Sequence, residues 1–262
     1  MSARAIWKGV LQLEKVEVPV KLYSAVEDKR VSFRLLHRDD GVPVKQVMVN
    51  PDTGKVVEYE DIQRGYVTPE GRIVSLDPSE LDELEPEPSR DIEVLRFVPP
   101  DAIEHRWFER PYYLGPDGDP DAYFALAAAL ARVERVGVAR WVMRAKEYQG
   151  ALRLHAGYPM LVTLKHAGEV LPLEEFQPRS DQDLDEKQLK MARQLIQMLA
   201  DDFEPEAYED EYRESVLALI ESKREGKKVR PKRAPKRPRT DDLTAALERS
   251  LAAGGDKAAA RA

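Results

Sequence analysis

The N-terminal part of the chain has a hydrophobic pattern with a period of two residues, which is typical of half-buried β-strands. The clearest example covers residues 16–22, where the apolar side chains are Val16, Val18, Val20 and Leu22. Between them lie Glu17, Pro19 and Lys21. Because proline cannot donate a backbone hydrogen bond, Pro19 favours an edge position or the start of a strand. We therefore predict a strand here, in a fold whose first part is mainly β.

Short apolar runs separated by turn-forming residues predict further strands. Residues 47–49 and 56–57 flank the sequence NPDTG, whose composition is typical of a hairpin turn. A second turn at Glu70-Gly71 leads into an apolar run, and the acidic, proline-bearing residues 83–89 predict a loop. Two more strands are expected over residues 92–98 and 160–165.

One helix is predicted in the middle of the chain. It begins at Asp119-Pro120, a capping residue followed by proline at the first helical position, and a stop is expected at Gly137. Residues 138–153 fit either a helix or a strand. We favour the strand, because β-branched and aromatic residues directly follow the glycine.

From residue 185 the apolar period lengthens to that of an amphipathic helix. Two helices are predicted, the first from Asp185 and the second after Pro205, ending at Gly226. Their apolar stripes are too regular for an isolated exposed arm, so we expect them to pack across a two-fold axis and to make an obligate dimer. The interface residues predicted on this basis are Leu189, Ile196, Leu199, Tyr212, Val216 and Leu219.

The last part of the chain combines a basic linker with a short helix. Residues 227–239 hold eight basic residues, no acidic residue and three prolines, a composition that predicts an extended segment. Beyond it Leu243, Leu247 and Leu251 lie on one helical stripe, too short to be stable alone, which predicts docking on a partner. We thus divide the chain into a core (1–182), a helical arm (183–226) and a tail (227–262).

Charge is distributed unevenly along the chain. The whole chain has a net charge of −7, which alone argues weakly against a nucleic-acid-binding protein. Residues 1–226 contain 30 basic and 44 acidic residues, whereas residues 132–166 contain seven basic and two acidic ones. Any DNA site in the body must therefore be a local basic surface on an acidic protein.

The sequence contains no recognisable catalytic or metal-binding motif. There is no cysteine, and the four histidines show no ligand spacing, so no metal and no cofactor are expected. The motifs of phosphate-binding loops and nucleophile elbows are missing as well. Acidic clusters at residues 117–121 and 181–185 lack the glycine and glutamate of a calcium loop, and both precede helices, so helix capping explains them better.

A stripe of basic residues indicates function more clearly than these motif searches do. If residues 138–146 form one strand, Arg140, Arg144 and Lys146 point to one face, about 6.6 Å apart for every two residues, which is comparable to the phosphate spacing along DNA. A solvated sheet face explains the same pattern. We also find no secretion signal and no apolar stretch of membrane-spanning length, so a soluble intracellular protein is expected.

Several stretches, in this order, resemble bacterial Ku proteins. The first is Arg4-Ala5-Ile6-Trp7-Lys8-Gly9 with Pro19-Val20-Lys21-Leu22-Tyr23-Ser24-Ala25, and the second is Phe97-Val98-Pro99 with Arg110-Pro111-Tyr112-Tyr113-Leu114. Residues 139–152, then 191–192, 201–203, 208 and 212–213 follow, and the tail helix at 241–251 is similar to a recurrent Ku segment. Many relatives carry cysteines near the first hairpin, where this chain has Val47-Met48-Val49-Asn50, so no metal or thiol function is expected there.

The resemblance implies an α+β fold with a mainly-β barrel core that forms half of a DNA-encircling ring, followed by a helical arm and a flexible basic tail. It implies a non-enzymatic protein of the bacterial cytoplasm, associated with the nucleoid. Such a homodimer binds double-stranded DNA ends in non-homologous end joining without reading their sequence. It also implies recruitment of an ATP-dependent DNA ligase of the ligase D type, with Leu243, Leu247 and Leu251 as the docking residues.

Charge and strand face select the residues expected to contact DNA. In the body these are Lys8, Lys21, Arg34, Lys45, Arg140, Arg144, Lys146 and Arg153, and in the tail they are Lys232, Arg233, Lys236 and Arg237. Two other functions stay open from the residues alone. One is a chromatin-like or regulatory DNA-binding protein that acts through its basic tail, and the other is a hydrolase with an acidic site.

Overall fold

The computed structural model describes residues 4–118, 120–173, 185–227 and 247. The chain forms two compact units, each described by itself below. The first unit contains residues 1–29 and 33–172, and the second contains residues 30–32 and 173–262.

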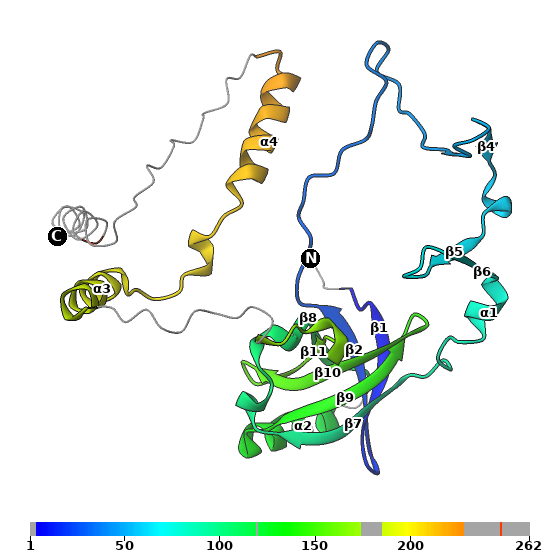
Figure 1. The fold of residues 1–262 in the computed structure, drawn as a ribbon. Coiled ribbons are helices and arrows are strands. Elements are labelled where there is room, and N and C mark those ends of the chain that lie inside the picture. Colours follow the sequence, from blue (N-terminus) through cyan, green and yellow to red (C-terminus); the bar gives the residue numbers. More distant parts are fainter. Residues whose placement is uncertain (1–3, 119, 174–184, 228–246, 248–262) are drawn as a thin grey trace. The chain divides into compact units, whose positions relative to one another are not determined.

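A closed barrel of seven strands is the core of the first unit (Figure 1). Around the barrel the order is β1-β2-β8-β11-β10-β9-β7, and every pairing is antiparallel except that of β1 with β7. The strands are β1 (Trp7–Leu13), β2 (Val16–Ser24), β7 (Asp91–Val98), β8 (Phe108–Pro116), β9 (Val136–Met143), β10 (Lys146–His155) and β11 (Tyr158–Leu164). The fold class predicted from the sequence, α+β with a barrel core, is confirmed.

The alternating apolar side chains that predict β2 also fill the interior of the barrel. Val18, Val20 and Leu22 are buried, whereas Pro19 lies exposed, upstream of the part of β2 that pairs with β8. Helix α2 (Pro120–Val133) closes the core, because it buries Tyr123, whose hydroxyl donates a 2.6 Å hydrogen bond to the carbonyl of Leu114. Short 3-10 turns η2 (Pro100–Ala102), η3 (His105–Trp107) and η4 (Ala167–Glu169) complete the barrel's connections.

A tightly packed aromatic pair links β9 and β10. The indole of Trp141 is 2% exposed and stacks on Tyr148 with a centroid distance of 5.5 Å. A Cβ atom at Gly150 would come within 2.7 Å of this indole and 2.8 Å of the carbonyl of Val162. A side chain at position 150 would therefore push Trp141 out of the core.

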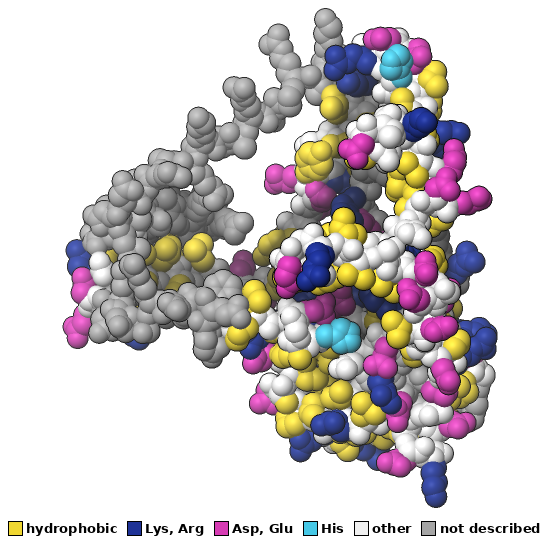
Figure 2. All heavy atoms as spheres, turned by 45° about the vertical axis from the view of Figure 1, so that its right-hand side comes forward, with side chains coloured by type: hydrophobic (Ala, Val, Ile, Leu, Met, Phe, Trp, Pro, Cys, Tyr) yellow, Lys and Arg dark blue, Asp and Glu magenta, His cyan; other side chains and the backbone are white. Residues whose placement is uncertain are grey.

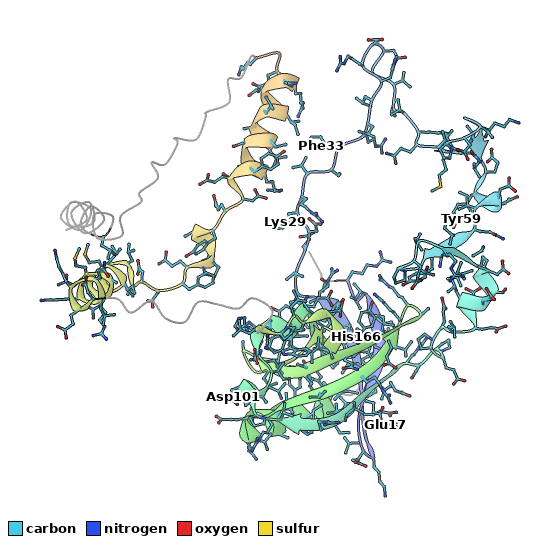
Figure 3. The ribbon with its side chains drawn as sticks, viewed as in Figure 1. Glu17, Lys29, Phe33, Tyr59, Asp101 and His166 are labelled. Atoms are coloured by element: carbon cyan, nitrogen blue, oxygen red, sulfur yellow. The ribbon has the colours of Figure 1, made fainter. Side chains whose placement is uncertain are left out.

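Between β2 and β7 the chain makes a long excursion, which we define as residues 26–90. It contains β3 (Met48–Val49), β4 (Val56–Val57), η1 (Tyr59–Asp61), β5 (Arg64–Val67), β6 (Ile73–Leu76) and α1 (Pro78–Asp82). Strands β3 and β4 form the hairpin predicted from the turn between them, and β5 and β6 form a second hairpin around the predicted turn at Glu70-Gly71. No residue of the excursion is buried, and Phe33 and Tyr59, labelled in Figure 3, are examples of its exposed aromatic side chains.

The second unit contains α3 (Glu186–Leu199), η6 (Pro205–Ala207) and α4 (Glu211–Arg224). The carboxylate of Asp185 accepts a 2.7 Å hydrogen bond from the backbone of Gln188, and the side chain of Gln188 takes part in return in a capping box. This capping explains why the acidic run that ends at Asp185 precedes a helix. The predicted start of α3 is confirmed.

Three sequence predictions about elements need correction, and two strands were not predicted. Helix α2 ends at Val133, four residues before Gly137, which lies inside β9. Residues 138–153 form two strands rather than one, because a turn follows Met143. Strands β1 and β8 are missing from the sequence prediction, and α4 begins at Glu211 instead of directly after Pro205, because residues 205–207 form a separate 3-10 turn.

Candidate nucleic-acid interface

Two predicted DNA-contacting lysines share one carboxylate on the outside of the barrel. Lys8 on β1 and Lys21 on β2 are register partners, and both point outward because their neighbours Gly9, Val20 and Leu22 are buried. The ammonium groups lie 3.0 and 2.8 Å from the carboxylate oxygens of Asp117. This cluster of Lys8, Lys21 and Asp117 has a net charge of +1.

The ion pairs also shift pKa values within the cluster. The hydrogen bond from Lys21 raises the pKa of that lysine, and the hydrogen bonds from Lys21 and Lys8 lower the pKa of Asp117. Lys21 and Asp117 therefore both stay charged over the physiological pH range. A DNA phosphate must compete with Asp117 for the two lysines, which makes this cluster a weak phosphate site.

The positive charge of Arg140 is also neutralised by a nearby carboxylate. It lies opposite Glu93 of β7 in the register of β9, and its guanidinium donates a 2.8 Å hydrogen bond to the Glu93 carboxylate. The hydrogen bond to Glu93, together with the charges of Glu93 and Glu147, raises the pKa of Arg140. Its surroundings are thus acidic, which disfavours a phosphate.

The predicted basic stripe does not lie along one strand. Arg140 is on β9, Arg144 lies in the turn after it, and Lys146 begins β10. The interpretation of one continuous strand face is therefore wrong, because residues 144–145 reverse the chain. Arg153, farther along β10, lies with its guanidinium 5.1 Å from the ring centroid of Phe108, a cation–π contact.

Arg34 and Lys45 have a different setting, on the excursion. Backbone hydrogen bonds of 2.8 Å from His37 to Val42 and 3.0 Å from Val44 to Leu35 form a short antiparallel ladder. Arg34 and Lys45 are the next residues along the two segments, beyond the last hydrogen bond of this ladder. Both side chains add positive charge at the end of this ladder, and clustered positive charge attracts phosphates.

The stretch around this ladder is the most basic part of the excursion. Residues 29–55 contain six basic and three acidic residues. Figure 2 shows basic, acidic and apolar side chains interspersed on the visible face of the molecule. Among the body residues predicted to contact DNA, Arg34 and Lys45 are the two that lie in this basic stretch.

The described part of the chain offers no cluster of three His, Asp or Glu side chains suited to a metal ion. Nor does it contain a helix with the length and apolar character needed to span a membrane.

Comparison with known proteins identifies the fold. The family model described as the Ku70/Ku80 beta-barrel domain matches residues 12–191, which cover most of the barrel and the start of α3. The chain belongs to the Ku family.

Curated bacterial relatives match nearly the whole chain. "Non-homologous end joining protein Ku" of Koribacter versatilis is 37% identical over 97% of this chain and 88% of its own length. The proteins of the same name from Bacillus subtilis and Mycobacterium tuberculosis are 33% and 34% identical, over 96% and 95% of this chain and 82% and 95% of their own lengths. The predicted membership of the bacterial Ku family is confirmed.

The apolar residues predicted for a Ku dimer lie exposed on the second unit. On α3 and α4 these are Leu189, Ile196, Leu199, Tyr212 and Leu219, while Val216 is half-buried. In the tail, Leu247 is helical and 8% exposed. The other tail residues predicted to bind DNA or ligase lie outside the described residues: Lys232, Arg233, Lys236, Arg237, Leu243 and Leu251.

A second exposed apolar surface, which the sequence pattern did not predict, lies on the Ku excursion. Strands β5 and β6 pair Tyr66 with Val74 and Val67 with Ile73, and these side chains are 47–74% exposed. Neighbouring residues of a strand point to opposite faces, so both faces of this hairpin are apolar. The sequence did contain a signal for this surface. It has two adjacent apolar residues on each strand, within a segment that is too polar to form a core of its own.

Proposed function

We propose that this Ku chain forms a homodimeric ring that binds the ends of double-stranded DNA without reading their sequence. It acts by binding and not by catalysis, protects the ends and brings an ATP-dependent DNA ligase to them. The observation that carries the proposal is the excursion of 65 residues, inserted between two barrel strands and without a buried residue.

Such a segment needs a partner. An isolated two-stranded hairpin is marginally stable in water, and the β5–β6 hairpin exposes apolar side chains on both faces. A second copy of the chain is the occupant that a symmetric assembly supplies, because a two-fold axis places the same patch on both partners. The exposed stripes of α3 and α4 would form a further part of this dimer interface.

A ring made from two such excursions explains both end preference and sequence indifference. A closed loop can be entered only at a DNA terminus, and side chains that line it meet phosphates before base edges. Lys and Arg residues then supply affinity by releasing counterions. The acidic remainder of residues 1–226 would keep DNA away from other surfaces.

The first prediction concerns Arg34 and Lys45, the two residues of the basic stretch that are predicted to contact DNA. Replacing both by glutamine should weaken binding to linear duplex and flatten the salt dependence, by about 0.9 in log–log slope for each phosphate that the protein no longer neutralises. Fluorescence anisotropy between roughly 50 and 200 mM salt measures the slope.

Two single variants serve as comparisons for this pair. Lys15→Gln, on the β1–β2 turn, should leave the slope unchanged, and Arg140→Gln should change it little because Glu93 already neutralises that guanidinium. An unchanged slope for the double variant would remove Arg34 and Lys45 from the DNA surface. Equal affinity for duplexes of unrelated sequence is expected throughout.

The second prediction separates the two parts of the tail. Charge reversal at Lys232, Arg233, Lys236 and Arg237 should weaken DNA binding at moderate salt and leave ligase recruitment largely intact, because extended basic segments bind DNA through screened charges. Replacing Leu243 and Leu247 by Asp should do the opposite. The measurements are anisotropy with labelled duplex and end joining by the cognate ligase.

The leucine variant decides whether the tail helix recruits the ligase. If the double variant stimulates the ligase as well as the parent chain does, another segment performs the recruitment. The alternative of a regulatory protein that binds DNA through its tail predicts that deletion of residues 227–262 abolishes DNA binding, whereas a ring retains it.

A further inference from the structure

The Asp117 cluster, made up of Lys8, Lys21 and Asp117, has the geometry of an occupied anion site. The ammonium groups of Lys8 and Lys21 lie 3.0 and 2.8 Å from the two different carboxylate oxygens of Asp117. Lys8 also donates a 3.3 Å hydrogen bond to the oxygen that Lys21 contacts. Lysine binds the oxygens of a carboxylate and those of a phosphate in the same way. Asp117 thus lies where a DNA phosphate would contact both lysines.

The backbone fixes the position of this carboxylate. Strand β8 pairs with β2 as far as Pro116, which lies opposite Val20. One residue later, the amide of Asp117 donates a 3.1 Å hydrogen bond to the carbonyl of Pro19. Gly118 then bends the chain with a φ of 112°, a conformation that suits glycine. Asp117 is therefore a fixed part of the barrel wall, and its side chain is only 26% exposed.

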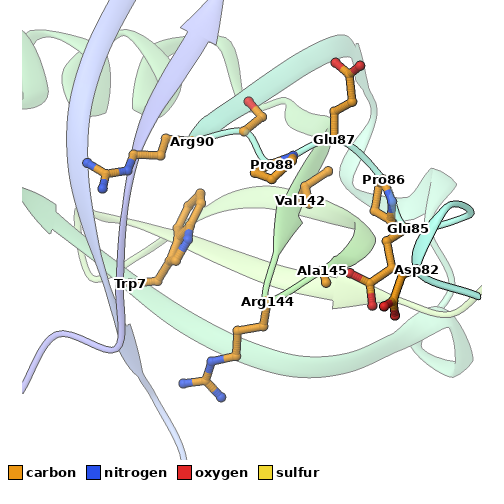
Figure 4. A pocket seen from close by; sticks show the side chains of 11 residues that line it. Trp7, Asp82, Glu85, Pro86, Glu87, Pro88, Arg90, Val142, Arg144 and Ala145 are labelled. Atoms are coloured by element: carbon orange, nitrogen blue, oxygen red, sulfur yellow. The ribbon is translucent and has the colours of Figure 1, made fainter. Parts of the chain in front are cut away.

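Two other groups of cations on the barrel unit have a different balance of charge. Arg140 is neutralised one to one by Glu93. The cavity of about 630 Å³ beside the β9–β10 turn has three carboxylates in its lining against the guanidiniums of Arg90 and Arg144, which lie on either side of Trp7 (Figure 4). In the Asp117 cluster, by contrast, two ammonium groups share one carboxylate. One positive charge remains there for a phosphate.

We propose that Asp117 is a built-in substitute for a DNA phosphate, which a backbone phosphate of the duplex displaces from Lys8 and Lys21. The carboxylate holds both ammonium groups in place before DNA binds. It also lowers the affinity of the contact, because a phosphate must displace it. The inference rests on the proposed function, since a duplex must first enter the ring. It adds to that function a residue that limits how tightly the ring holds DNA.

The Asp117 cluster lies close to the start of the excursion. Lys21 is on the outward face of β2, because its neighbours Val20 and Leu22 are buried. Strand β2 ends at Ser24, and the excursion follows from residue 26 (Figure 1). The excursion forms the ring in the proposed function, so phosphates of a duplex in the ring come close to this part of the barrel wall.

A weakened phosphate contact suits a ring that does not read sequence. Phosphates are equivalent at every position along a duplex, so a ring moves along DNA as fast as its phosphate contacts exchange. When one phosphate leaves, Asp117 takes its place, so neither lysine is unpaired before the next phosphate arrives. Loss of this carboxylate should therefore give a ring that binds DNA more tightly and leaves it more slowly.

Asp117→Asn in the full chain tests the proposal, because asparagine has nearly the same shape and no charge. At roughly 50 mM salt the variant should bind linear duplex at least about threefold more tightly than the parent, with a log–log salt slope steeper by up to about 0.9 for each subunit. Its complex should dissociate at least about threefold more slowly after dilution into competitor duplex. Fluorescence anisotropy measures all three quantities.

Two control variants separate the position of the carboxylate from its charge. Asp117→Glu keeps a carboxylate beside the lysines and should bind within about twofold of the parent. Glu17→Gln removes the same charge from an exposed residue of β2 that forms no ion pair within the described part of the chain. It should leave the salt slope and the dissociation rate unchanged. Asp117→Ser should reproduce the tighter binding of Asp117→Asn, which guards against a folding defect of one variant.

A double-mutant cycle shows whether Asp117 acts through the two lysines. In a chain that carries Lys8→Gln and Lys21→Gln, Asp117→Asn should raise the affinity for linear duplex no more than Glu17→Gln does. An undiminished effect in that chain would overturn the proposal. Unchanged or weaker binding of both Asp117→Asn and Asp117→Ser in the parent chain would overturn it as well, while the ring stands. Failure of the parent to bind linear duplex would instead contradict the proposed function.

Discussion

Val67→Lys combined with Ile73→Glu should convert the protein into a monomer that no longer holds DNA ends. These residues are a cross-strand pair on the β5–β6 hairpin and are 60% and 74% exposed in the isolated chain. Burying a side chain of this size contributes about 1.5–3 kcal/mol, and a two-fold axis doubles the number of apolar side chains removed from the interface. We expect the dissociation constant of the dimer to rise at least about a hundredfold, since each 1.4 kcal/mol corresponds to about tenfold.

The substitutions are chosen to keep the hairpin folded. Lysine and glutamate facing each other across strands attract, so the pair preserves the local ladder while it removes the apolar face. Val16→Lys is the matched control, because Val16 is 56% exposed on β2 of the barrel and has no place in the proposed interface.

Analytical ultracentrifugation and anisotropy with linear duplex measure the two consequences. The account predicts a monomer without end binding for the double variant, and a dimer with normal binding for the control. A double variant that remains dimeric would place the interface elsewhere, on α3 and α4 alone. A monomer that still binds ends would remove the ring from the mechanism.

The barrel was partly predictable from the sequence because its strands follow a simple local rule. In β2 the alternation of Val18, Val20 and Leu22 corresponds directly to the inward face. Strand β8 was missed because its sequence, FERPYYLGP, has two prolines and no clean alternation. It is a strand because both β2 and β11 pair with it, which no local pattern reveals.

The candidate site was less predictable, because its arrangement depends on contacts between distant residues. Arg140 had the right charge and face, but the pairing of β7 with β9 sets Glu93 beside it. Asp117 likewise lies 96 positions from Lys21 in sequence and 2.8 Å from it in space. Charge pattern could identify basic residues but could not show which of them are already compensated.

The measurement that tests the ring most directly is a comparison of linear and covalently closed circular duplex of the same sequence and length. Both forms present the same phosphates, so a surface that binds DNA from the side would hold both equally. Entry into a closed ring requires an end, and the account therefore predicts stable binding to linear DNA and far weaker binding to the circle. Linearising the circle with a single cut should restore binding, and equal retention of the two forms in a gel-shift assay would contradict the account.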